Sequence, residues 1–189
     1  KAWVQHSVEI LGLMHAVLLT DPELLKPLLN QVLAKPWPGL LPQAWHPLTA
    51  YGAGDAPIDP HAVMLWLHFL GRCIACEAQD TLYLLPIAAY LDVQKDWVLN
   101  AKRAATRFGK IDLWAHVDRH GSFELDLSAH YAVTPKELRI RLPKATLRVE
   151  VDGQAIAAEG SWLRLSPRMQ KLRVRFEPVK TGAIVQTLE

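Results

Sequence analysis

The sequence has little of the features that point most directly to a function. Its 189 residues include two cysteines, carry a formal net charge of +2 and hold no charge-free apolar run long enough to cross a membrane. The charge is too evenly balanced for the basic surface typical of nucleic-acid-binding proteins. The P-loop, G-x-G-x-x-G and G-x-S-x-G motifs are absent as well. The sequence therefore predicts no binding to nucleic acid and none to a membrane.

The two cysteines, Cys73 and Cys76, form one isolated C-x-x-C pair. A structural zinc site takes four ligands, no second pair exists, and no acidic residue stands at ligand spacing beside His61 and His68. Redox-active pairs usually open a helix that follows a strand, whereas this pair comes late in an apolar segment. We therefore expect buried, unreactive thiols that pack like small hydrophobic side chains, with no metal and no cofactor.

The first half of the chain has the composition and spacing of packed helices. Half of all residues are hydrophobic and 21% are charged, which allows a sizeable core. Apolar residues at helical spacing predict helices over 3–19 and 21–34. Glu23 follows Thr20 by three residues, as in a capping box, so the second helix begins here.

A third helix is the stretch around which the rest of the chain is organised. It begins at Asp59, a capping residue, and Pro60 takes the first helical position. The helix is expected to continue to Ala78. From Val63 onward it is apolar nearly all round, so we expect neighbouring elements to bury it on several sides.

A long connection rich in proline, glycine and aromatic residues, 36–60, precedes this helix. Loops of this length in compact proteins are usually functional or disordered, and the aromatic side chains favour order. Sugar binding favours an aromatic platform beside hydrogen-bonding groups. We therefore expect substrate-binding residues in and next to this loop: Trp37, Trp45, His46, Tyr51 and His61.

From Ile111 onward the hydrophobic pattern has a period of two. Residues 111–117 and 123–129 alternate in this way and predict a hairpin, and the Asp152-Gly153 pair is a strong signal for a second hairpin. Residues 93–106 fit a helix or a strand equally well. Further short strands are expected at 138–142, 146–151, 154–158, 161–165, 171–176 and 183–188.

These patterns predict an α+β fold in which a helical region precedes a small antiparallel β-sandwich. The helical region covers 1–92, a connecting segment covers 93–110, and the sandwich covers 111–189. Six arginines fall at outward positions of the predicted strands, and we interpret them as a solvated sheet face interleaved with Glu150 and Glu177 rather than as a basic binding patch. They are Arg139, Arg141, Arg148, Arg164, Arg173 and Arg175.

The order of several short segments resembles the C-terminal part of large glycoside hydrolases of the α-L-fucosidase and α-L-rhamnosidase type. In those enzymes an (α/α)6 toroid is followed by a β-sandwich. The likeness extends from about 59 to 176 and consists of packing and turn signatures. The segments that carry it are Glu77-Ala78-Gln79-Asp80, Thr81-Leu82-Tyr83-Leu84-Leu85-Pro86, 106–111, 138–143 and 149–153.

This resemblance implies a partial (α/α) toroid in a carbohydrate-active protein. A complete toroid needs about twelve helices of ordinary length, and this chain supplies four or five. The missing helices would come from the remainder of the same protein or from a partner chain.

Glycoside hydrolysis normally uses two carboxyl groups that flank the scissile bond, about 5–10 Å apart. In the helical half, capping explains three acidic residues: Asp21, Glu23 and Asp59. Asp55 in the loop and Glu77 in the apolar helix remain as candidate catalytic residues, because a carboxyl group in an apolar setting can serve as a general acid. A structural ion pair of Glu77 with Arg72 or Arg103 is the alternative.

Three functions therefore stay open at this point. The first is the C-terminal portion of a glycoside hydrolase that acts on an oligo- or polysaccharide. The second is a non-catalytic interaction or carbohydrate-binding module. The third is a polysaccharide lyase fragment that uses Tyr51 and His46.

Overall fold

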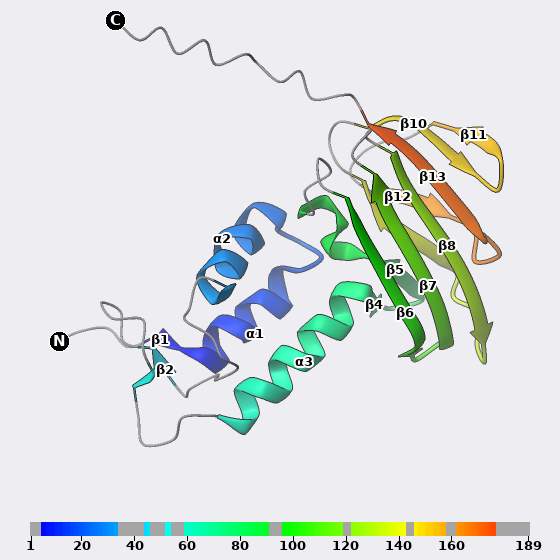
Figure 1. Ribbon diagram of the computed structural model, residues 1–189. Helices are drawn as coiled ribbons and strands as arrows, with labels where there is room; N and C mark the ends of the chain where they lie inside the picture. The colour runs from blue at the N-terminus through cyan, green and yellow to red at the C-terminus, as the bar shows by residue number, and fades with distance from the viewer. Residues whose placement is uncertain are drawn as a thin grey trace, which may run out of the picture.

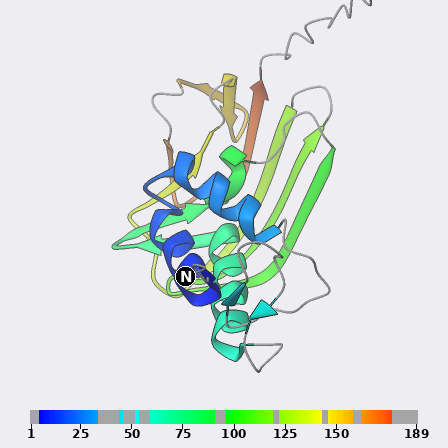
Figure 2. The same cartoon turned by 90° about the vertical axis from the view of Figure 1, so that its left-hand side faces the viewer.

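The computed structural model describes residues 5–33, 44–45, 52–53, 59–90, 96–118, 122–142, 146–157 and 162–176. This part of the chain has an α+β fold, with three α-helices gathered on one side of two larger sheets (Figure 1, Figure 2). One sheet has six strands, the other has four, and a small sheet pairs β1 (Gln5–His6), β2 (Ala44–Trp45) and β3 (Gly52–Ala53). The predicted fold class is confirmed at this level.

The helical layer consists of α1 (Ser7–Val17), α2 (Pro22–Leu33) and α3 (Pro60–Ile74), close to the predicted ranges. Asp59 caps α3 as predicted, because its Oδ1 accepts a hydrogen bond from the His61 amide at 2.9 Å. These helices share an apolar core. Its buried members are Leu11, Met14, Val17, Leu18, Leu25, Val32, Ala62, Phe69 and Cys73.

The cap of α2 differs from the prediction by one residue. Asp21 Oδ1 accepts a hydrogen bond from the Leu24 amide at 3.0 Å, whereas the Thr20 hydroxyl donates to the carbonyl of Ala16 at 3.2 Å. Thr20 therefore lies in the turn that ends α1, and the aspartate, which is a stronger acceptor, caps the next helix.

The helix α3 ends at Ile74, so the predicted continuation to Ala78 is wrong. Ala75 has an extended backbone (φ −146°, ψ 127°) and begins strand β4 (Ala75–Ala78), which pairs antiparallel with β5 (Thr81–Leu84). The turn between them places Gln79 at φ 50°. A short apolar run fits a helix or a strand equally well, and here the pairing with β5 decides.

The remaining strands complete the two larger sheets. The six-stranded sheet has the order β11-β10-β13-β8-β7-β6, and the four-stranded sheet has the order β12-β9-β5-β4. The strands are β6 (Trp97–Thr106), β7 (Gly109–Asp118), β8 (Ser122–Tyr131), β9 (Glu137–Arg141), β10 (Thr146–Val151), β11 (Gln154–Ile156), β12 (Trp162–Leu165) and β13 (Lys171–Phe176).

Both predicted hairpins are confirmed. Strand β7 pairs with β8 along its whole length, and the turn between β10 and β11 places Asp152 at φ 48° and Gly153 at φ 82°.

The ambiguous segment 93–106 contains strand β6, which pairs with β7. The strands β5 and β9 run parallel, so the expectation of a wholly antiparallel sandwich is wrong. The strand expected at 183–188 lies outside the described residues.

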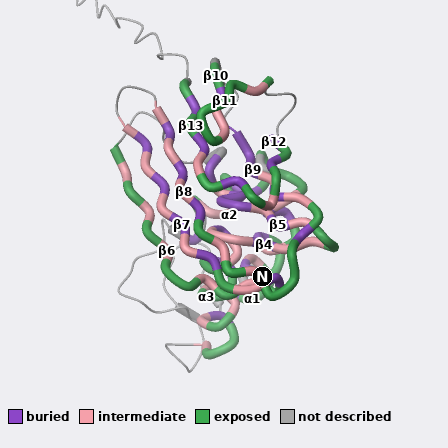
Figure 3. The backbone as a smooth tube through the Cα atoms, turned by 90° about the vertical axis from the view of Figure 1, so that its right-hand side faces the viewer, coloured by how far each residue is buried: buried purple, intermediate pink, exposed green. Residues whose placement is uncertain are grey.

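The two larger sheets face each other over one apolar core. Alternate residues of β7 and β8 are buried, as Figure 3 shows along both strands, and β5, β9 and β12 supply the opposite wall. A 3-10 helix, η1 (Pro86–Tyr90), connects the two cores, because Ala88 lies in the sandwich core and Ile87 packs on the helical one. Strands β4 and β5 thus pair within the four-stranded sheet of the sandwich, although their residues fall in the predicted helical region 1–92.

Helix α3 is not buried on several sides. Phe69, Ala62 and Cys73 face the helical core, but Met64 and Leu67 are 61% and 62% exposed. Leu70 is exposed as well. The expectation that neighbours cover this helix nearly all round is therefore wrong for the chain by itself, and an apolar stripe remains on its outer side.

We expect Gly109→Ala to lower the free energy of unfolding by about 3 kcal/mol. Gly109 has φ +136°, and a Cβ atom there would clash with the backbone carbonyl oxygen of His130. Gly12 in α1 has open space around it, so Gly12→Ala should be neutral or stabilising by about 0.5–1 kcal/mol. Urea denaturation of both variants measures the difference. An equal effect at the two positions would contradict the close backbone approach at Gly109.

Candidate functional site

Most of the predicted site residues lie outside the described part of the chain. The side chains of Trp37, Trp45, His46, Tyr51 and Asp55 all lie outside the part of the chain that the structure describes. His61 lies exposed in the first turn of α3, with its Nδ1 3.6 Å from Asp59 Oδ1. Glu77 lies on β4, beyond the other end of the same helix, and the 1.5 Å rise per residue puts His61 about 20 Å from the last residue of that helix, Ile74. Of the predicted catalytic pair, Glu77 is described and Asp55 is not.

The expected setting of Glu77 in an apolar helix is wrong, because this residue lies on strand β4. Its Oε1 accepts a hydrogen bond from the backbone amide of Arg107 at 2.9 Å. The nearby Asp80 forms an ion pair with Lys136 Nζ at 2.6 Å, and that hydrogen bond lowers the pKa of the Asp80 carboxyl group. Both carboxylates therefore tie the β4–β5 hairpin to neighbouring turns.

The two cysteines lie where α3 meets the sheet. Both thiols are free and buried, as predicted, and burial raises the pKa of Cys73 to about 12. Arg72 donates to Cys76 Sγ through Nε at 3.2 Å and through its second terminal nitrogen at 3.1 Å. The same guanidinium lies 3.1 Å from His15 Nδ1. Arg72 thus joins α1, α3 and β4 through hydrogen bonds.

The strongest candidate site is the face of the four-stranded sheet that points away from the sandwich core. Leu82 and Leu84 of β5 are buried in the core, so Tyr83 between them points to the opposite face. The strand register places Arg139 beside Tyr83 and Arg164 beside Arg139, and it pairs Arg141 with Trp162. We call this set the arginine–tryptophan face; it comprises Thr81, Tyr83, Glu137, Arg139, Arg141, Trp162 and Arg164.

The aromatic rings of this face are stacked with guanidinium groups. Tyr83 and Trp162 meet edge to face, with ring centroids 5.1 Å apart. The Arg141 guanidinium lies 5.1 Å from the Trp162 ring centroid and that of Arg139 lies 5.9 Å from the Tyr83 ring. Cation–π contacts of this kind hold the rings and charges in a fixed arrangement. Both rings are half-buried, so part of each is open to a ligand.

A single carboxylate, Glu137, serves three partners on this face. It accepts a hydrogen bond from Arg139 Nε at 2.7 Å and from the Thr81 hydroxyl at 3.3 Å. Its second oxygen lies 3.7 Å from Arg164 Nε. Among the described residues of the face, Glu137 is therefore the only acidic group beside three guanidinium groups, and the face carries an excess of positive charge.

Arg141 differs from the predicted solvated arginine. It is only 7% exposed, and one terminal nitrogen of its guanidinium is buried without a hydrogen-bond partner. The six arginines also do not share one face, because Arg148 and Arg173 lie on the six-stranded sheet, where they pair with Glu150 and Glu124. The expectation of one solvated sheet face is thus wrong.

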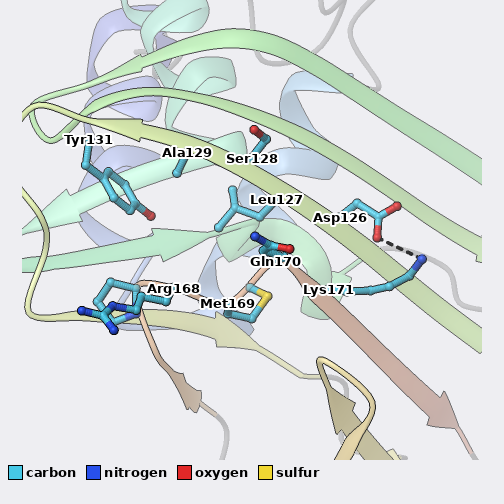
Figure 4. Close-up of a pocket in the computed structure, with 10 residues that line it drawn as sticks. Asp126, Leu127, Ser128, Ala129, Tyr131, Arg168, Met169, Gln170 and Lys171 are labelled. Atoms are coloured by element: carbon cyan, nitrogen blue, oxygen red, sulfur yellow. Dashed lines mark ion pairs between the residues drawn. The ribbon is translucent and has the colours of Figure 1, made fainter.

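A pocket of about 800 Å³ lies at the far end of β8 (Figure 4). Strand β13 pairs with β8 in register up to Lys171, opposite Asp126, and the segment 167–170 before β13 lines the pocket together with the remainder of β8. Tyr131 lies at one end of the pocket, and the Asp126–Lys171 ion pair of 3.4 Å lies at the other. Its remaining lining residues are Leu127, Ser128, Ala129, Pro167, Arg168, Met169 and Gln170.

The pocket offers fewer constraints on a ligand than the arginine–tryptophan face. The Tyr131 hydroxyl is buried without a hydrogen-bond partner, and burial raises the pKa of this phenol, so it stays a neutral donor. The charges of Asp126 and Lys171 offset each other. The pocket can hold a small polar group, and its lining selects no particular class.

Sequence reasoning missed the arginine–tryptophan face. Its residues are spread from Thr81 to Arg164, and the pairing that joins them includes the parallel β5–β9 contact. The available signal was that Tyr83 alternates with buried leucines, and Arg139, Arg141 and Trp162 do the same in their strands. Such alternation shows which side chains share a face of one strand, but not which strands are neighbours.

No known protein family matches the chain, and no curated protein matches it. Within the described residues, no three His, Cys, Asp or Glu side chains gather as a metal site would require. Of the helices that the structure describes, none has the length and apolar character to span a bilayer.

We expect Cys73→Ala to make the free energy of unfolding decrease less steeply with pH in the alkaline range. The unfolded thiol ionises near its ordinary pKa of 9.0, whereas the folded one does so at about 12. Between these values the unfolded chain binds fewer protons, so stability falls as pH rises, by at most about 1.4 kcal/mol per pH unit. Denaturation at pH 8 to 11 measures the slope. Val17→Ala truncates another buried residue of this core and should keep the wild-type slope. A slope unchanged by Cys73→Ala would contradict the assignment.

Proposed function

We propose that this is a carbohydrate-active protein and that its arginine–tryptophan face binds a saccharide. The observation that carries the proposal is the pair of half-exposed rings, Tyr83 and Trp162, held against the guanidinium groups of Arg139 and Arg141. The apolar face of a sugar ring packs on aromatic rings, and its hydroxyl groups accept hydrogen bonds from arginine. A rigid strand framework positions both kinds of contact.

The composition of the face supports binding rather than hydrolysis at this place. Glycosidases use two carboxyl groups on opposite sides of the bond that is cleaved. Here Glu137 is the only carboxylate among the described residues of the face, and it already bonds Arg139 and Thr81. The geometry therefore favours the carbohydrate-binding module among the functions considered from the sequence.

A second candidate function is the C-terminal portion of a glycoside hydrolase with an (α/α) toroid. Its support is the exposed apolar stripe of α3, formed by Met64, Leu67 and Leu70, together with the order of helices before sandwich strands. In this proposal, toroid helices from the rest of the protein or from a partner chain cover the stripe. The loop 36–60 would contact the substrate, and Asp55 in that loop would be one of the two catalytic carboxyl groups.

We expect Trp162→Ala to weaken oligosaccharide binding at least tenfold, about 1.4 kcal/mol, because the sugar loses its stacking surface. Trp114 is the matched control: it is also a half-buried tryptophan, but it lies on the six-stranded sheet beside His116. Trp114→Ala should leave the affinity unchanged. Isothermal titration calorimetry with a panel of oligosaccharides measures both. Equal affinities of wild type and Trp162→Ala would overturn this site.

We expect Leu67→Glu to release the helices or the partner chain that cover α3, because a charge in an apolar contact is strongly unfavourable. Val98 lies on β6 of the six-stranded sheet and is 62% exposed, as is Leu67. Val98→Glu is thus the matched control and should leave the assembly intact. Gel filtration of the native protein, with hydrolase assays on oligosaccharides, gives the readout. Intact assembly in both variants would exclude the stripe as the contact surface.

A further inference from the structure

We infer that the saccharide bound on the arginine–tryptophan face is an acidic one that carries carboxylate groups, as in a uronate-containing oligosaccharide. This inference rests on the saccharide binding proposed above and adds the class of ligand. Its basis is the charge of the face, where Glu137 is the one described carboxylate beside three guanidinium groups and contacts only those of Arg139 and Arg164. A neutral sugar would leave this excess of positive charge uncompensated.

The first supporting observation is the buried positive charge of Arg141. Buried charges in proteins are generally paired, yet this side chain is 93% buried and one terminal nitrogen has no hydrogen-bond partner. Its described contact is the Trp162 ring, 5.1 Å from the guanidinium carbon. A ring compensates a buried charge less than an anion does. Arg141 therefore holds a permanent positive charge directly beneath the aromatic surface.

The second observation is the pairing of Arg164 with Arg139. The strand register places these residues directly opposite each other on β12 and β9, and like charges in this position repel. Glu137 offsets the repulsion only in part, because its second oxygen lies 3.7 Å from Arg164 Nε. The Arg164 side chain is 75% exposed, so it can bind a ligand carboxylate in the planar, two-point geometry that guanidinium groups favour.

The ligand class follows from the combination of these groups. A sugar ring on Trp162 and Tyr83 would place an attached carboxylate beside the neighbouring guanidinium groups. On the six-stranded sheet, Arg148, Arg173 and Lys171 each pair with an acidic residue. A nucleic acid needs a continuous basic track along its backbone. The confined excess on this face suits a short stretch of acidic sugar residues instead.

The test compares acidic oligosaccharides with their own methyl esters, which keep the sugar rings and remove the charge. The probes are oligogalacturonate, mannuronate oligomers from alginate, their methyl esters, and a short single-stranded oligothymidylate. Titration by calorimetry should give at least tenfold weaker binding of the ester, and the affinity for the acid should fall as salt concentration rises.

Matched variants distinguish the effect of these arginines on ligand preference from the effect of surface charge in general. Arg141→Gln and Arg164→Gln should each reduce the preference for the acid over the ester. Arg164 is exposed, so its variant keeps the test valid if Arg141→Gln fails to fold. Arg175→Gln removes an exposed arginine of β13 on the six-stranded sheet and should leave the preference unchanged.

The outcomes distinguish this inference from the proposed function. Equal affinity for the acid and the ester would overturn the acidic ligand and leave saccharide binding in place. Binding to none of the saccharides by the folded protein would overturn both. Oligothymidylate bound as tightly as the acidic oligosaccharide would also overturn the inference, because the face would then select charge without selecting a sugar.

Discussion

The parallel pairing of β5 with β9 is the contact on which the rest of the structure depends. It joins residues 81–84, which follow directly from the helical layer through β4, to residues 137–140 of the later strands. Without it, β4 and β5 would be held to the sandwich only by the packing of their buried residues against the six-stranded sheet. Parallel strands need a long connection between them. Here the connection from β5 to β9 contains β6, β7 and β8, and these strands of the six-stranded sheet form the other layer of the sandwich.

The same pairing produces a core on one side and a candidate binding surface on the other. Leu82 and Leu84 enter the sandwich core together with Leu138 and Ile140, so the intervening Tyr83 and Arg139 must meet on the outer face. Burial of the leucines supplies the stabilisation, and the outer residues are positioned as a consequence. This explains how a cluster of arginines with one shared carboxylate persists: its geometry is imposed by the core behind it, so mutual repulsion of the charges does not separate the strands.

The helical layer is organised in a different way. Its core is contiguous across α1, α2 and α3, but α3 also presents Met64, Leu67 and Leu70 to solvent. An amphipathic helix hides one stripe, whereas a helix that is apolar nearly all round has more surface than two neighbours can cover. The sandwich core is thus enclosed by its two sheets, whereas the helical layer leaves apolar side chains of α3 exposed. Arg72 anchors this layer to the sheet through Cys76.

Local chemistry determined much of the secondary structure from the sequence alone: the Asp59 cap, the approximate positions of three helices, the β7–β8 hairpin and the Asp152-Gly153 turn depend on residues close together in the chain. The candidate binding face could not be predicted in this way. The end of α3 at Ile74, the strand identity of 97–106 and the burial of Arg141 were decided by tertiary structure. Each depends on a partner strand distant in sequence, and hydrophobic periodicity within one segment carries no information about which strand that partner is.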